Sequence, residues 1–279
     1  MAPAQTYVER LPYPPLADVV RTVWVQQIGP EPYLQRNLPT GGVELHCPVG
    51  SVPRVVGPLT GPSVEWLAPE ETVVGVRFQP GVACTVLGMP ARELVDRTVG
   101  LDEVWGRAAL ALGEHVAGAP SPEAALDVVQ HELAGRRVDA TPPDPLVAEV
   151  VQQLMPWRSE RIGSLGARVG ISESQLRRRC LSAVGIGPKS LQRILRFQGF
   201  LARAQARNAD PTAPADGGLA ALAAASGYAD HAHLSRECMR LSGVSPRTYV
   251  GEGTQCECGH DHSASFLPML RSRRAPTPA

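Results

Sequence analysis

The fold is decided by two stretches that resemble each other, GISESQLRRRCLSAVGIGP at 170–188 and GYADHAHLSRECMRLSGVSP at 227–246. The opening glycine recurs after 57 residues, and the leucine at 176 recurs after 58. The one-residue difference between these two offsets arises between the glycine and the leucine, where a turn can accommodate an added residue. An internal repeat this regular predicts two copies of one supersecondary unit.

Each copy has the layout of a helix-turn-helix. In the first, the pattern predicts a short helix over 162–169, a tight turn at Gly170, and a second helix over 173–184 that Ser172 caps. In the second, the equivalent helices are expected over 219–226 and 230–241. The sequence therefore predicts two helix-turn-helix units in the C-terminal half.

Helical spacing sorts the side chains of the second helix in each unit. Leu176 and Cys180 point to the core in one copy, and Leu234 and Cys238 do so in the other. On the outer faces an arginine can donate two hydrogen bonds to guanine, and a small alanine suits a thymine methyl. The outward residues are Ser174, Arg177, Arg178 and Leu181 in the first copy and Ala232, Ser235, Arg236 and Met239 in the second, with His231 and His233 beside them.

One helix is predicted between the copies, over 188–207, with Pro188 in its first turn. Such a helix can hold two reading helices so that they enter successive major grooves, roughly 34 Å apart. Its apolar stripe consists of Leu191, Ile194, Leu195, Phe200 and Leu201.

These residues resemble the DNA-binding module of the AraC/XylS family of bacterial regulators. The match covers about 150–250, and it is densest in the second copy, at Gly227-Tyr228, 233–238 and 243–249. The resemblance implies that the base contacts are made by Ser174, Arg177, Arg178, His231, Ala232, His233 and Arg236. Two features depart from the family pattern: cysteine at 180 and 238, where phenylalanine is usual, and a longer connection over 208–217.

The N-terminal half has a different pattern. Runs of β-branched or alternating residues predict strands over 19–25, 43–47, 54–56 and 72–78, followed by helices over 91–95, 101–116 and 122–133. This predicts an α+β domain, a small β sandwich or barrel followed by helices, ahead of an all-α domain. The stretch 76–81 with Gly88 and 93–96 loosely resembles sensor domains that precede AraC-type modules, which implies a sensing or dimerising role.

Composition places the domain boundaries. Three prolines within 139–145 predict a linker, so we expect a sensor or dimerisation domain over 1–138, a DNA-binding domain over 146–253 and a flexible tail over 254–279. Residues 1–145 hold 10 Lys and Arg against 17 Asp and Glu, a net charge of −7. Residues 146–279 hold 17 against 10, a net charge of +7, as expected where one half meets a polyanion.

Other classes of protein fit less well. No apolar run approaches the ~18 residues of a membrane span, and the N-terminus has no secretory pattern, so a cytoplasmic protein is expected. The six cysteines are expected to be thiols. Nucleophile-elbow, dinucleotide and phosphate-loop motifs are absent, so no enzyme activity and no cofactor is expected.

Two metal-based alternatives stay open. Glu44 and His46 would be ligands of a cupin-like metal enzyme, although such a site needs further ligands. The C-terminal segment holds four soft or borderline metal ligands, Cys256, Cys258, His260 and His262. If they bound a metal ion, the protein would be a metal-responsive regulator.

The sequence as a whole predicts a sequence-specific transcription regulator. Its expected partners are double-stranded DNA, a small-molecule effector acting through the N-terminal domain, a second copy of the chain in a homodimer, and RNA polymerase if the protein is an activator.

Overall fold

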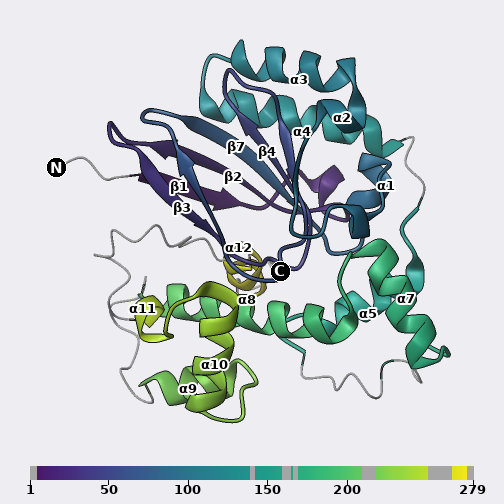
Figure 1. The fold of residues 1–279 in the computed structure, drawn as a ribbon, viewed down its shortest axis with the longest axis vertical. Coiled ribbons are helices and arrows are strands. Elements are labelled where there is room, and N and C mark those ends of the chain that lie inside the picture. The colour runs from purple at the N-terminus through teal and green to yellow at the C-terminus, as the bar shows by residue number, and fades with distance from the viewer. Residues whose placement is uncertain are drawn as a thin grey trace, which may run out of the picture.

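The computed structural model describes residues 5–138, 142–158, 165, 169–208, 218–250 and 266–274. It contains a β-rich N-terminal domain with helices on one side and an all-helical C-terminal domain beneath it (Figure 1). This is the predicted fold class: an α+β domain followed by an all-α domain.

The N-terminal domain is a small sandwich of two antiparallel sheets. The larger sheet has the order β1-β2-β7-β4-β5-β8, and a two-stranded sheet pairs β3 with β6. Four of these strands were predicted, and β1, β3, β6 and β8 were not. The strands are β1 (Gln5–Arg10), β2 (Val20–Ile28), β3 (Tyr33–Asn37), β4 (Glu44–Pro48), β5 (Arg54–Val56), β6 (Ser63–Leu67), β7 (Thr72–Phe78) and β8 (Thr98–Gly100).

Helices cover one face of the larger sheet. Alternate residues of β2, including Val23 and Val25, lie in the same buried apolar cluster as Leu126 and Val129 of α4. The helix predicted over 101–116 is divided at Gly106, whose positive φ of 56° leaves the helical path. The helices of this domain are the short 3₁₀ turns η1 (Pro14–Leu16) and η2 (Ala91–Glu93), with α1 (Ala83–Leu87), α2 (Asp102–Trp105), α3 (Arg107–Ala117) and α4 (Pro122–Val138).

The C-terminal domain is organised around one long helix, α8. Every residue of the predicted apolar stripe on α8 is buried, in a core to which the helices on either side contribute. Asp144 and Pro145, predicted to lie in a linker, instead cap and begin α5: the Asp144 carboxylate accepts a hydrogen bond from the Leu146 amide. The helices are α5 (Pro145–Leu154), α7 (Glu173–Ala183), α8 (Pro188–Asn208), α9 (Gly218–Ala225), α10 (His231–Ser242), α11 (Arg247–Val250) and α12 (Leu267–Arg274).

The predicted flexible tail is wrong for residues 266–274. This segment forms α12, which packs against α8. Phe266 is buried in the helical core, with its ring edge-on to Trp157 and the guanidinium of Arg21 4.5 Å from its centroid. Leu267, Met269 and Leu270 pack against the same core beside Phe266, and composition alone does not reveal this anchoring. No helix in the described part of the chain is long and apolar enough to cross a membrane.

The space between the two sheets is filled by polar side chains. Arg77 is buried, with its Nη1 2.9 Å from a carboxylate oxygen of Glu9 and its Nε 3.1 Å from one of Glu44. Thr40 donates to the same oxygen of Glu44. Burial alone would raise the pKa of Glu44, but the charge of Arg77, helped by His46 and Thr40, outweighs it and lowers that pKa to about 2. The ion pair therefore stabilises this domain only while Glu44 is ionised.

We predict that Glu44→Gln lowers the free energy of unfolding by about 3 kcal/mol at pH 7, because it removes a carboxylate partner of the buried Arg77. Since the folded pKa of Glu44 lies below its ordinary value of 4.5, its contribution is complete above pH 4.5 and is lost as the pH falls towards about 2. The difference between the two proteins in urea unfolding should therefore shrink over that interval.

The matched control for this variant is Glu93→Gln, which removes an ion pair with Arg92 in which both side chains are exposed. It should change stability by no more than about 0.5 kcal/mol. If the two variants lose the same stability with the same pH dependence, the Glu44–Arg77 pair does not have the role assigned to it.

Candidate DNA-binding surface

The first reading helix, α7, begins with a capping box. The Ser172 hydroxyl accepts a hydrogen bond from the Gln175 amide at 3.2 Å, and the Gln175 side chain accepts one from the Ser172 amide at 3.0 Å. The preceding Gly170 has a φ of 70°, which a residue with a side chain rarely adopts. The predicted turn and cap are confirmed. Of the helix predicted over 162–169, only Leu165 and Val169 are among the described residues; Leu165 is fully buried.

The sides of α7 divide as the helical spacing predicts. Leu176 and Cys180 are buried, whereas Ser174, Arg177 and Arg178 are exposed on the opposite side. The exposed residues lie in the N-terminal half of the helix, the end from which a helix-turn-helix reads base edges.

The second reading helix, α10, repeats this arrangement. Asp230 is its N-cap and accepts a hydrogen bond from the His233 amide at 2.6 Å. Leu234 and Cys238 are buried, and the exposed residues are His231, Ala232 and Arg236.

His233 differs from the other six predicted contact residues because its ring is half-buried. It lies edge-on to Tyr228, with the ring centroids 5.2 Å apart, and its Nδ1 is 3.5 Å from the Ala229 amide. The packing against Tyr228, in the turn before α10, could not be obtained from helical spacing. His233 therefore has a supporting contact within the unit as well as an edge toward solvent.

An ion pair fixes each reading helix at the same place in the repeat, and sequence reasoning missed both pairs. Arg179 of α7 contacts Asp144, the cap of α5, at 2.6 Å. Glu237 of α10, which is 58 residues further on, accepts a hydrogen bond from Nε of Arg193 of α8 at 2.8 Å. That hydrogen bond lowers the pKa of Glu237, so its carboxylate is ionised at neutral pH. The sequence has an arginine at 179 and a glutamate at the matched position 237, and this difference in charge could have indicated the two ion pairs.

The cysteines that replace the usual phenylalanine are both fully buried. Burial raises the pKa of Cys180 to about 11 and that of Cys238 to about 12. Both thiols are therefore protonated at neutral pH and act as small apolar core residues rather than nucleophiles.

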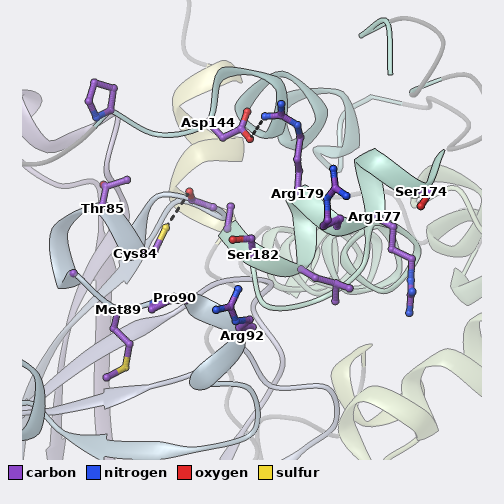
Figure 2. A pocket seen from close by; sticks show the side chains of 16 residues that line it. Cys84, Thr85, Met89, Pro90, Arg92, Asp144, Ser174, Arg177, Arg179 and Ser182 are labelled. Atoms are coloured by element: carbon purple, nitrogen blue, oxygen red, sulfur yellow. Dashed lines mark hydrogen bonds and ion pairs between the residues drawn. The ribbon is translucent and has the colours of Figure 1, made fainter. Parts of the chain in front are cut away.

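A cleft of about 1100 Å³ separates the outer side of α7 from the N-terminal domain (Figure 2). Ser174 and Arg177 lie on its helical wall, while Met89, Pro90 and Arg92, from the segment around η2, form the opposite wall. All three predicted contact residues on α7, Ser174, Arg177 and Arg178, thus line the cleft between this helix and the N-terminal domain.

The metal-based alternatives gain no support. His46 lies 3.3 Å from one oxygen of Glu44, but Glu44 is already bound by Arg77 and Thr40. Across the described ranges, no three His, Cys, Asp or Glu side chains lie close enough together to hold a metal ion. Cys256, Cys258, His260 and His262 lie outside the described residues.

Two capped helices with exposed polar N-terminal halves, each preceded by a tight turn and packed on one connecting helix, define a helix-turn-helix DNA-binding protein. Residues 165–251 match a family model described as a helix-turn-helix domain, and residues 8–100 match a domain of unknown function, DUF6597. The C-terminal domain is of the AraC type, and the chain is a DNA-binding transcription regulator.

Solved structures of ToxT from Vibrio cholerae are similar to this chain at low sequence identity. An apo variant from strain SCE256 is 11% identical and has a TM-score of 0.44, with 89% of this chain and 97% of that chain covered. The protein from O395 is 11% identical with a TM-score of 0.43, covering 90% and 98%. Wild-type ToxT bound to an unsaturated fatty acid is 11% identical with a TM-score of 0.39, covering 88% and 94%. No curated protein sequence matches the chain.

We predict that Glu237→Ala destabilises the second unit by about 1–3 kcal/mol, because it removes a charged hydrogen bond and leaves the half-buried Arg193 without this partner. Thermal unfolding of the full chain measures the change. Glu173→Ala is the matched control, since its ion pair with Lys189 is exposed on both sides and spans 3.7 Å. The control should lose no more than about 0.5 kcal/mol. Equal losses in the two variants would contradict the role given to Glu237.

Proposed function

We propose that the protein reads a two-part operator, with α7 in one major groove and α10 in the next. The observation that carries this proposal is the matched exposure of Arg178 and Arg236, each two residues after the buried leucine of its helix. An arginine at such a position can donate to O6 and N7 of one guanine. The residues proposed to contact bases are Ser174, Arg177, Arg178, His231, Ala232, His233 and Arg236.

The charge distribution supports the same assignment. Residues 146–279 have a net charge of +7 and residues 1–145 a net charge of −7. A basic DNA-binding half gains affinity from phosphate contacts, which depend on salt and not on base sequence. The acidic half is repelled by the same phosphates, so the N-terminal domain is expected to face away from the duplex or to regulate access to it.

The N-terminal domain is proposed to sense a small molecule. A second cleft, of about 480 Å³, lies where this domain meets α5, and that volume is typical of sites for small ligands. Its walls include Val82 and Val86 of the N-terminal domain and Ala148 and Val151 of α5. A ligand between the two domains would touch both and so could alter DNA affinity.

A thermal-shift screen of small molecules tests the sensing role, with Val86→Trp as the variant that fills the cleft. Compounds that stabilise the wild type and not this variant would support it. If every stabilising compound acts equally on both proteins, the effector does not bind there.

Assembly and partners are part of the proposal. A homodimer would bind two copies of the two-part operator. Sedimentation of the full chain measures whether the protein dimerises. Contact with RNA polymerase would follow if the protein activates transcription. The family and fold are those of regulators and not of enzymes.

We predict that Arg178→Ala and Arg236→Ala each weaken binding to the preferred operator by about 1–3 kcal/mol and relax base preference in different halves of it. Selection from a random DNA pool defines the operator, and titration against single-base variants measures the relaxation.

The contrasting result is a loss that is equal for every DNA sequence, with a salt dependence reduced by about one phosphate contact. Both arginines would then bind the backbone, and the proposed base contacts would be wrong. Arg97→Ala is the control, because Arg97 is an exposed arginine of the acidic domain whose Nη1 donates to the Glu93 carbonyl. The Arg97→Ala variant should leave both the affinity for the operator and the base preference unchanged.

A further inference from the structure

The N-terminal domain contacts the two helix-turn-helix units at the same position of the repeat. Gly185 follows α7, and its equivalent Gly243 follows α10, 58 residues later. Both glycines lie against the N-terminal domain, each against a different part of it. A chance contact of two domains gives no reason for this match.

At the first unit the contact is close and involves backbone. A Cβ added to Gly185 would lie 2.8 Å from the carbonyl oxygen of Ala91, in η2, and 2.9 Å from Cγ2 of Val95. Only a residue without a side chain allows this approach. The end of the first unit and η2 are therefore in direct backbone contact at Gly185.

At the second unit the contact is made by side chains of the smaller sheet. Arg36 of β3 donates a hydrogen bond to the carbonyl of Ser242, the last residue of α10, at 3.4 Å. A Cβ at Gly243 would lie 3.2 Å from Nη1 of Arg36 and 3.9 Å from Pro62.

Between these points the N-terminal domain lies on the connecting helix. Gln198 of α8, which is fully buried, donates to the Pro39 carbonyl at 2.9 Å. The loop glycine Gly41 lies against Leu191 and Leu195 of the same helix, and Leu38 belongs to the helical core. These contacts, together with those at Gly185 and Gly243, are called the interdomain contact below.

We infer that the interdomain contact determines which spacing between the two operator halves the protein accepts. The N-terminal domain holds each unit at the end of its reading helix away from the base-reading half, so the domain fixes the relative orientation of α7 and α10. This inference rests on the proposed function, since it needs both helices to read bases. It gives the N-terminal domain a direct effect on operator choice, because any change in its shape alters the relation between the two units.

Gly185→Ala tests the inference, and Gly170→Ala is its matched control. Both glycines belong to the first unit and have positive φ, 85° and 70°, so alanine is strained at either position. Only at Gly185 does the added Cβ meet the N-terminal domain; at Gly170 nothing lies within 4 Å. A difference between the variants therefore reports on the interdomain contact and not on backbone strain.

The measurement is the affinity of the full chain for operators whose two halves are moved apart by one to about five base pairs, the last being roughly half a helical turn. Wild type and Gly170→Ala should prefer one spacing and lose about tenfold or more at half a turn, a free-energy difference of about 1.4 kcal/mol. Gly185→Ala should bind all spacings within about threefold, that is within less than 1 kcal/mol.

A second variant keeps the test decisive if Gly185→Ala does not fold. Arg36→Ala removes the contact at Ser242 and should also flatten the spacing profile, whereas Arg97→Ala should not. If the folded contact variants keep the wild-type profile and base preference, the inference is wrong. If the wild type shows no base preference on any DNA, it is the proposed function that fails.

Discussion

Burial of one face of α8 is the interaction on which the rest of the structure depends. The helix spans 188–208, and its buried residues include Leu191, Ile194, Phe197 and Phe200. Both helix-turn-helix units, α12 and a loop of the N-terminal domain pack on it. At 1.5 Å per residue the 21 residues extend about 31 Å, close to one turn of duplex DNA. A helix of this length can separate two reading helices by the distance between successive major grooves.

The two units share their packing and differ in how they are attached. Each has a cap, a buried leucine and a buried cysteine at matched positions. Each reading helix has an ion pair at this matched position, but the charge on the helix differs. The basic Arg179 joins α7 to α5, whereas the acidic Glu237 joins α10 to α8. The first unit is therefore attached through the helix that follows the domain boundary, and the second through the connecting helix. A structural change at the domain boundary would therefore displace the first unit before the second.

Much of this architecture could be predicted because it follows from local patterns. The reading helices, their caps and α8 follow from helical spacing, and β2, β4, β5 and β7 follow from β-branched runs. The strands β1 and β3 escaped prediction because their inward residues are polar: Gln5 donates to Tyr33, and Gln26 of β2 donates to Gln35. A polar interior has no hydrophobic alternation to reveal it.

Features that depend on distant neighbours could not be predicted. The edge-on contact of His233 with Tyr228 needs the turn geometry, and the docking of Phe266 needs Arg21 from the other domain. The interdomain contact at Gly185 is of the same kind. Its glycine was visible as part of the repeat, but the carbonyl of Ala91 that requires it lies 94 positions away in the sequence.

The most direct measurement of the central claim is a map of guanine N7 methylation on the selected operator, with and without protein, because N7 lies in the major groove. Two reading helices on one connecting helix predict two protected patches on the same face of the duplex, with centres about 10 base pairs apart. A single protected patch, or two on opposite faces of the duplex, would contradict the account.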